Sequence, residues 1–264
     1  MRFLIAVVLL VVSCGPAEKV KSEHYYFKKT VHHPDAHWSY EGATGPEYWG
    51  KLSASYSLAD AGKKQSPVNI DTRKVVEDKL PELIFRYHSE ERPDFINNGH
   101  TLQHQQEEDG SEIEVAGKHY KLEQFHLHSP SEHTVDGKYF PVELHMVHKA
   151  EDGEVAVLAI FYKAGESSQA LKYVAHAKLP EKEGDKTVMK QGIHLRDLVP
   201  AQPDYYTYSG SFTTPPCTEG VKWFILKQEL EADGKLLDKL AEILKHNNRP
   251  VQDIDGREVH GVGD

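Results

Sequence analysis

The middle of the chain consists of short segments in which apolar residues alternate with polar ones or run almost without interruption. Residues 124–128 and 143–147 alternate with the period of two that is typical of a β-strand. Residues 155–162 and 221–226 are nearly continuous apolar runs, which suit strands inside a large sheet. A late segment follows helical spacing instead, with apolar residues at Leu236, Leu240, Ile243 and Leu244. The pattern predicts a mainly β domain with a large central sheet and an amphipathic helix that covers part of it.

The N-terminal residues have the pattern of an export signal. The apolar run 3–12 is too short to span a bilayer and is typical of a secretory signal. Val11-Val12-Ser13-Cys14 resembles the lipobox of a bacterial lipoprotein, which predicts lipidation of Cys14, although the small residues there also suit an ordinary signal peptidase. Residues 15–36 are polar and lack apolar periodicity, so we expect a tether. The expected organisation is therefore a signal peptide at 1–14, a tether at 15–36, a domain at 37–260 and a tail at 261–264.

The residue after the lipobox bears on the destination of the protein. Gly15, and not aspartate, follows Cys14. By resemblance to Gram-negative lipoproteins, this favours the outer membrane. We therefore expect an exported protein of the periplasm or cell envelope, held at the outer membrane by an N-terminal lipid anchor. The sequence does not fix the oligomeric state, and a homodimer is one candidate.

The charge of the chain limits its partners. A formal net charge of −10 at pH 7 excludes nucleic acid as a partner, because DNA or RNA binding needs a basic surface. An acidic balance of this size mainly favours solubility. The acidic run 107–110, which ends in glycine, is predicted to be the solvated tip of a hairpin.

Three histidines on the two alternating segments are the strongest chemical signal. His126 and His128 project from one face of their strand, and His145 shares a face with Glu143 and Val147 on the other strand. If the two strands are neighbours, the three imidazoles form one site. Three imidazoles with an open fourth position are typical of catalytic zinc, whereas structural zinc usually has four ligands that include thiolates, and no cysteine lies near this cluster.

The residues beside these histidines separate a metal site from a chance pairing. The chain has 17 histidines, so a His-x-His pair on a protein surface is the alternative reading. Gln124 and Glu143 lie two positions before His126 and His145, on the same strand faces, where partners that fix the imidazole tautomers are needed. This context favours the metal site.

Five motifs in the same order resemble the α-class carbonic anhydrases. They are QSPVNI from Gln65, NNGH from Asn97, QFHLHSPSEHTVDGKYFPVELHMVH from Gln124, SFTTPPCTEG from Ser211 and NNRPVQ from Asn247. The resemblance extends from about Trp38 to about Val259 and implies an α+β, mainly β fold: a twisted, mostly antiparallel sheet of about ten strands with short peripheral helices. It also implies reversible hydration of carbon dioxide to bicarbonate and a proton by zinc-bound hydroxide. The Zn²⁺ ligands would be His126, His128 and His145.

The resemblance assigns roles to polar residues around the metal. Thr213 would accept the proton of the attacking hydroxide in a hydrogen bond and donate its own proton to Glu132, which would orient the nucleophile. The backbone N–H of Thr213 would bind substrate oxygen or an anionic inhibitor, and Thr214 would line the polar side of the pocket. His100 matches the proton shuttle of the family, since imidazole titrates near neutral pH.

An apolar wall for carbon dioxide is also implied by the resemblance, because the substrate is small and nonpolar. Its residues would be Val147, Val157, Phe212 and Trp223. Phe212 departs from the leucine that is common at this position, and a phenyl ring there would narrow the pocket. We therefore expect slower turnover than in relatives with leucine, and inhibition by sulfonamides and small anions.

Two other functions remain open at this point. His126, His128 and Glu132 fit part of the metal motif of cupins, which often hold iron or manganese, although the glycine and proline positions of that motif do not match. The second alternative is an inactive carbonic-anhydrase-like domain that only binds a ligand. All three zinc histidines are present, as are Thr213 and Glu132, which favours the enzyme.

The cysteine content predicts that no disulfide forms within the mature chain. The two cysteines are Cys14 and Cys217, and lipidation or removal of Cys14 leaves Cys217 without a partner. Many exported relatives pair a cysteine at this position with one upstream of the QSP motif, but residues 56–64 contain none. We expect Cys217 to be a buried thiol, with an intermolecular disulfide as the alternative.

Overall fold

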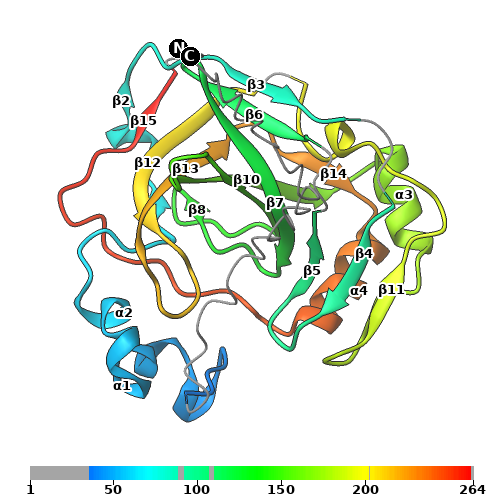
Figure 1. The fold of residues 1–264 in the computed structure, drawn as a ribbon, viewed down its shortest axis with the longest axis horizontal. Coiled ribbons are helices and arrows are strands. Elements are labelled where there is room, and N and C mark those ends of the chain that lie inside the picture. Colours follow the sequence, from blue (N-terminus) through cyan, green and yellow to red (C-terminus); the bar gives the residue numbers. More distant parts are fainter. Residues whose placement is uncertain (1–35, 89–91, 107–109, 202, 263–264) are drawn as a thin grey trace, which may run out of the picture. The chain divides into compact units, whose positions relative to one another are not determined.

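Strands far outweigh helices in the computed structural model, which describes residues 36–88, 92–106, 110–201 and 203–262 (Figure 1). The predicted signal peptide, Cys14 and nearly all of the predicted tether lie outside the described residues. Residues Ala36–Asp264 form one compact unit by their contacts.

The secondary structure of this unit comprises fifteen strands and four α-helices in the described residues. The strands are β1 Asn69–Ile70, β2 Val76–Glu77, β3 Leu83–Arg86, β4 Asp94–Asn97, β5 Leu102–Gln105, β6 Glu112–Val115, β7 Lys118–His128, β8 Thr134–Val135, β9 Val142–Lys149, β10 Val155–Ala164, β11 Lys186–Val188, β12 Tyr205–Ser211, β13 Glu219–Leu226, β14 Leu230–Ala232 and β15 His260–Gly261. The helices are α1 Trp49–Leu52, α2 Leu58–Ala61, α3 Gln169–His176 and α4 Gly234–Leu244. Across the described part of the chain, none of the helices has both the length and the apolar character that a membrane span requires.

Thirteen of these strands join into one large sheet. Ten follow one another in the order β11-β4-β5-β7-β9-β10-β13-β12-β15-β2, while β14 pairs with β10, and β6 links β3 to β7. Most neighbours are antiparallel, and the parallel pairs are β10 with β13, β10 with β14 and β15 with β2. The predicted fold class is confirmed, and the sheet is somewhat larger than expected.

The segments with the strongest sequence patterns form the elements that those patterns predict. The two apolar runs are β10 and β13 at the centre of the sheet, and the segment with helical spacing is α4. The Asp233 side chain accepts a hydrogen bond from the N–H of Lys235 and so caps the first turn of α4. Helix α4 buries its leucines against the sheet, as the pattern predicted.

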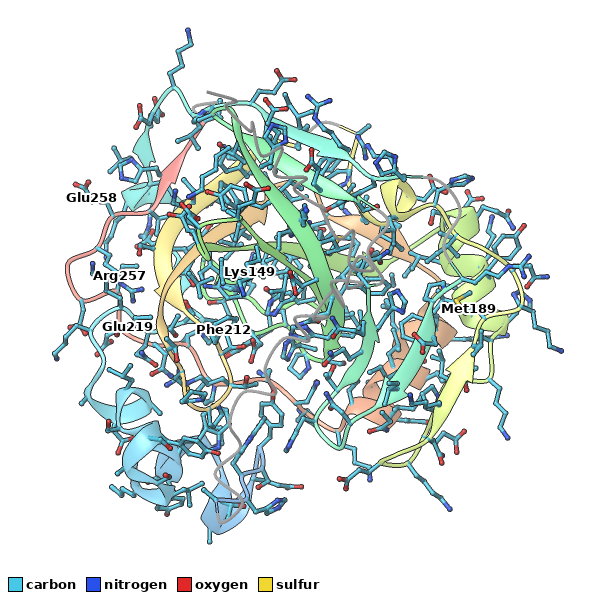
Figure 2. The ribbon with its side chains drawn as sticks, in the orientation of Figure 1. Lys149, Met189, Phe212, Glu219, Arg257 and Glu258 are labelled. Carbon is cyan, nitrogen blue, oxygen red and sulfur yellow. The ribbon has the colours of Figure 1, made fainter. Side chains whose placement is uncertain are left out.

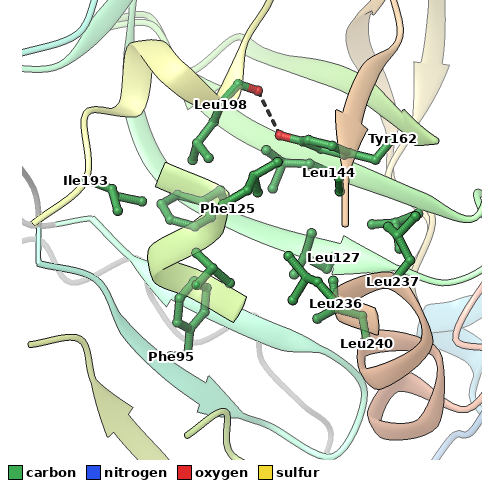
Figure 3. A pocket seen from close by; sticks show the side chains of 14 residues that line it. Phe95, Phe125, Leu127, Leu144, Tyr162, Ile193, Leu198, Leu236, Leu237 and Leu240 are labelled. Carbon is green, nitrogen blue, oxygen red and sulfur yellow. Dashed lines mark hydrogen bonds between the residues drawn. The ribbon is translucent and has the colours of Figure 1, made fainter. Parts of the chain in front are cut away.

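The two faces of β7 and β9 serve different purposes. We call the face with Gln124, His126, His128, Glu143 and His145 the histidine face. Residues that alternate with these point the other way, into an apolar layer between the sheet and helices α3 and α4 (Figure 3). That layer encloses an apolar cavity of about 40 Å³, whose lining includes Phe125, Leu127, Leu144, Leu236, Leu237 and Leu240.

A β-bulge at Glu123 sets which side chains of β7 reach the histidine face. Leu122 pairs with His148, but Gln124 already pairs with Val147, so Glu123 is an extra residue in the ladder. Tyr120 and Leu122 therefore belong to the same apolar layer as Phe125, which lies an odd number of positions further on. The bulge shifts the alternation by one and directs the histidines away from the core.

The predicted hairpin around residues 107–110 is wrong. Residues 107–109 lie outside the described residues, but β5 and β6, the strands before and after them, are described. β5 and β6 do not pair with each other, because both pair antiparallel with β7. They therefore run in the same direction along β7, and the acidic run connects two successive segments that share one partner strand.

Candidate functional site: three converging imidazoles

The pairing of β7 with β9 brings the three predicted ligands together. His126 lies directly opposite His145, and His128 lies opposite Glu143. One ring nitrogen from each of His126, His128 and His145 falls within 4.8 Å of the others. The condition that the sequence left open, that the two strands are neighbours, is therefore met.

Each imidazole uses its other nitrogen in a hydrogen bond with a fixed acceptor. The pairs are His126 Nδ1 with Gln124 Oε1 at 2.8 Å, His128 Nδ1 with the backbone oxygen of Asn247 at 2.7 Å, and His145 Nε2 with Glu143 Oε1 at 2.8 Å. Because all three acceptors are oxygens, each of these ring nitrogens carries the proton. The lone pairs that remain, on Nε2 of His126 and His128 and on Nδ1 of His145, are the converging ones.

The converging atoms include buried groups that lack a partner. His128 Nε2 and Glu132 Oε2 are both buried without a hydrogen bond in the described structure, and they lie 3.5 Å apart. Buried polar atoms are normally satisfied, so an orphaned imidazole nitrogen beside two others indicates a place for a missing group. Three neutral imidazoles are a donor set that suits zinc, and the residues therefore fit that ion.

Burial keeps two of the candidate ligands, His126 and His128, in the form that binds metal. It lowers the pKa of His126 well below the usual value, and the neighbouring rings of His128 and His145 add to the effect. Burial also lowers the pKa of His128, although Glu132 opposes the shift. Both rings are therefore neutral at pH 7, as coordination requires.

Glu143 anchors His145 within a fully satisfied network. Its Oε2 accepts hydrogen bonds from the N–H groups of Glu132 and His133 at 2.7 and 2.9 Å, and its Oε1 contacts His133 Nδ1 at 2.7 Å as well as His145. Burial would raise the pKa of Glu143, but the His133 and His145 rings lower it well below the usual value. A second possible metal cluster, His133, Glu143 and His145, coincides with this network and is explained by its hydrogen bonds.

The network continues to a tyrosine that the sequence did not single out. His133 Nε2 lies 2.8 Å from the hydroxyl of Tyr208, which contacts Ser66 Oγ at 2.8 Å. Burial raises the pKa of Tyr208, so its hydroxyl stays protonated. Ser66 belongs to the QSPVNI motif, and its placement gives that motif a role in supporting the site.

Glu132 is held beside the imidazoles but outside their cluster. Its Oε1 accepts a hydrogen bond of 2.8 Å from the backbone N–H of Arg249. The predicted hydrogen bond between Thr213 and Glu132 is absent from the described structure. Thr213 is buried and Thr214 is half-buried, in the loop between β12 and β13.

The four residues of the predicted apolar wall do come together. Val147, Val157 and Trp223 form a row across β9, β10 and β13, since Val157 pairs with both of the others. Phe212, on the loop after β12 (Figure 2), packs against the same cluster. The Trp223 ring lies 4.9 Å from the His145 ring, so the row adjoins the imidazoles.

His100 lies in the turn after β4, where its ring stacks on an indole. The rings of His100 and Trp38 are 3.7 Å apart and nearly parallel, at 7°. The backbone N–H of His100 donates to Asn98 Oδ1 at 3.0 Å. Sequence reasoning missed Trp38 as a partner of His100, because the two are far apart along the chain and no spacing links them.

Cys217 is a buried free thiol, as predicted. It is fully buried in a cluster with Trp38, Trp49, Tyr56 and Ala59. Burial raises the pKa of Cys217 to about 12, so the thiol is neutral and unreactive at pH 7.

Comparison with known proteins places this fold and site in one family. The family model described as eukaryotic-type carbonic anhydrase matches residues 44–262. A carbonic anhydrase of Neisseria gonorrhoeae is 40% identical over 234 residues, which cover 88% of this chain and 91% of that protein. The α-carbonic anhydrase of Thermovibrio ammonificans, solved with the inhibitor sulfanilamide, is 40% identical with a TM-score of 0.80 and covers 85% of this chain and 99% of its own.

The same fold also occurs in a more distant protein with a different name. Dioscorin, solved with ascorbate, is 26% identical with a TM-score of 0.79, and the alignment covers 86% of this chain and 98% of that one. Fold alone is thus weaker support for the activity than the bacterial relatives and the complete imidazole triad. On the family match, the identity to bacterial enzymes and the shared architecture, this chain belongs to the eukaryotic-type, or α-class, carbonic anhydrase family.

Proposed function

We propose that this carbonic anhydrase converts carbon dioxide and water reversibly to bicarbonate and a proton at a zinc ion. The ligands would be Nε2 of His126, Nε2 of His128 and Nδ1 of His145. The observation that carries the proposal is the orphaned, buried Nε2 of His128, in a cluster of three imidazoles whose outer nitrogens are all held by hydrogen bonds. Zinc held by three imidazoles lowers the pKa of its bound water to about 7, a value that comes from carbonic anhydrases in general and is not a result for this chain.

The residues around the triad fix its protonation and its orientation. Glu143 accepts a hydrogen bond from the N–H of His145 Nε2, and this tautomer directs the lone pair of Nδ1 into the site. Gln124 and the backbone oxygen of Asn247 act in the same way on His126 and His128. The three rings are therefore set before any ligand arrives.

The apolar row beside His145 suits carbon dioxide. Val147, Val157 and Trp223 present apolar groups, and the indole N–H of Trp223 is occupied by the backbone oxygen of Ser211 at 3.0 Å. A nonpolar molecule gains by contact with such a surface, whereas charged solutes do not. Phe212 adds a phenyl ring at the edge of this row.

Thr213 and Glu132 would orient the attacking oxygen. Glu132 is fully buried and fixed through Oε1, which leaves Oε2 as an acceptor without a partner among the described residues. The hydroxyl of Thr213 would donate a hydrogen bond to this oxygen and accept one from the attacking hydroxide. Thr214 would contribute a polar edge, and the N–H of Thr213 would bind a substrate oxygen.

His100 would carry the released proton to buffer. An imidazole exchanges protons near neutral pH, and the His100 side chain is only half-buried. Stacking on Trp38 gives the ring a defined position.

The first test is stopped-flow hydration of carbon dioxide by the full chain, with metal content determined on the same sample. We expect one zinc per chain and rapid hydration, both lost in His145→Ala. His119→Ala is the matched control, because His119 lies on β7 but bonds to Glu112 on the surface. Zinc without hydration would favour a binding module, and iron or manganese in place of zinc would favour a cupin-like oxygenase.

Inhibitors offer a second test of the open coordination position. The relative from Thermovibrio ammonificans was solved with sulfanilamide, and we propose that sulfonamides and small anions also inhibit this chain. Inhibition should be competitive between a sulfonamide and an anion, since both would use the same position. Independent inhibition by the two would contradict a shared site.

We also propose that the enzyme is an exported lipoprotein attached to the outer membrane at Cys14. The support is the apolar run 3–12 and the lipobox-like sequence that ends at Cys14. Cys14→Ser should release the protein from the membrane fraction of a Gram-negative host. Retention of the Cys14→Ser variant in that fraction would contradict lipid anchoring.

A further inference from the structure

We propose that the side chain of Asn247 is a positioning residue for proton transfer, because it ties the backbone of His100 to the strand that carries His128. The proposal rests on the proposed function and assigns a role to the NNRPVQ motif. The backbone oxygen of Asn247 already supports the His128 ring. The inference concerns the amide side chain, whose bonds go elsewhere.

The amide of Asn247 uses both of its donors and its oxygen in hydrogen bonds to two segments. Its Nδ2 donates to the backbone oxygen of His100 at 2.9 Å and to that of Leu127 at 2.9 Å. Its Oδ1 accepts from the N–H of Ser129 at 2.9 Å. Leu127 and Ser129 flank His128 at the end of β7, so one side chain joins that strand end to the shuttle residue.

The orientation of this amide is determined by its partners. Two carbonyl oxygens face Nδ2 and one N–H faces Oδ1, so a 180° rotation would break all three bonds. The side chain is also buried, with 1% of the residue exposed, and an unsatisfied amide there would be costly. The connection between the two segments is therefore rigid.

Two further contacts hold His100, and neither of these two joins it to β7. The N–H of His100 bonds to Asn98 within the same turn, and its ring stacks on Trp38, which belongs to the N-terminal segment. The neighbouring Thr101 does contact β7, through hydrogen bonds with Leu127. Thr101 therefore keeps the turn attached if Asn247 is changed, while the direct link to His100 is lost.

The position of His100 matters because proton transfer is sensitive to small displacements. A misplacement of about 1 Å can reduce a rate by about 100-fold when reacting groups must be held at a fixed separation. Proton release to buffer follows the hydration step and does not involve carbon dioxide. A shift of His100 should therefore lower kcat, change kcat/KM much less and leave zinc content unchanged.

The decisive variant is Asn247→Asp, which keeps the shape of the side chain and the acceptor for Ser129. The substitution replaces the NH₂ group, which donates both hydrogen bonds, by a carboxylate oxygen that faces the carbonyl oxygens of His100 and Leu127. Asn247→Ser serves as the second variant if the carboxylate prevents folding. Asn248→Asp is the matched control, because Asn248 is the next residue and, among the residues that the structure describes, its amide bonds to the backbone oxygen of Ser131 alone, at 3.3 Å.

The test is stopped-flow hydration at low and high imidazole buffer, with zinc content and circular dichroism on each sample. We expect Asn247→Asp to lower kcat by about tenfold at low buffer, with recovery at high imidazole and a much smaller change in kcat/KM. In a His100→Ala background the same substitution should have no further effect. Asn248→Asp should match the wild type.

Several outcomes would overturn the proposal. An unchanged kcat in Asn247→Asp would do so, as would an equal fall of kcat and kcat/KM or a loss of zinc. A further fall of kcat in the His100→Ala background would show that Asn247 acts by another route. If the wild type itself neither binds zinc nor hydrates carbon dioxide, the proposed function fails first, and that result is distinct from all of these.

Discussion

Replacing Glu143 by glutamine should weaken metal binding through a change of tautomer. Both carboxylate oxygens of Glu143 accept two hydrogen bonds, Oε2 from backbone N–H groups and Oε1 from the rings of His133 and His145. A glutamine has one oxygen and one NH₂ group, so in either orientation the NH₂ faces two donors. If it faces the rings, His145 must move its proton to Nδ1, which is the nitrogen that would bind the metal.

The expected magnitude follows from these contacts. Two hydrogen bonds to a charged acceptor are lost, each worth about 1.5–3 kcal/mol, so the free energy of unfolding should fall by about 3–6 kcal/mol. Loss of the partner of a metal-binding histidine costs about 10–100-fold in metal affinity, a general range that draws partly on carbonic anhydrases. Zinc affinity should therefore fall by about that factor in Glu143→Gln.

Competition with a chelator at pH 7 measures the zinc affinity, and urea unfolding measures the stability. Glu154→Gln is a suitable control, because Glu154 is also a multiply bonded carboxylate but lies on the surface beside Lys118 and Lys222. It should leave zinc affinity unchanged. An unaltered zinc affinity in Glu143→Gln would refute the tautomer reasoning.

Three further changes test other parts of the structure. Phe212→Leu should raise the hydration rate several-fold, because a smaller side chain widens the space beside the apolar row; equal rates in stopped flow would remove the idea. Burial holds the pKa of the His148 imidazole at about 3 in the folded protein, whereas the pKa of the same imidazole in the unfolded chain is about 6.5. The unfolded state therefore takes up a proton first, and the free energy of unfolding falls as pH drops from about 6.5 to 3. That loss is about 2 kcal/mol between pH 7 and 5 and should disappear in His148→Gln, as urea unfolding at both values would show; the same pH dependence in both proteins would argue against it. Arg249→Lys should lower the free energy of unfolding by about 3 kcal/mol, because a single ammonium cannot replace three buried guanidinium bonds, and a change below about 1 kcal/mol would contradict this.

The parts of the fold that were predictable from sequence are those with strong local periodicity. The apolar runs of β10 and β13 and the leucine spacing of α4 reflect burial of one element at a time. The bulge at Glu123 left no such signal, because one extra residue changes the pairing and not the composition. The acidic run 107–110 was misread for a related reason: charged residues mark a solvated connection, and the strands it connects are determined by distant pairing.

The candidate site, like the fold, has parts that the sequence predicts and parts that it does not. His126, His128 and His145 were predictable because alternation on two short strands places them on common faces. The support from Asn247 was not, because it reaches His128 from 119 residues further along the chain. Arg249 similarly contacts Gln65 across 184 residues and thereby joins the NNRPVQ motif to QSPVNI. A motif match showed that these residues matter, but only the fold shows what they touch.

The two faces of β7 and β9 also constrain how this protein can diverge. Phe125 lies between Gln124 and His126 on the strand, and Leu144 precedes His145, so core residues and candidate ligands share one backbone. A substitution in the apolar layer that shifts either strand moves the imidazoles as well. Substitutions in the apolar layer are therefore limited by selection for activity at the histidine face. Relatives that lose the activity should accumulate changes first in that layer.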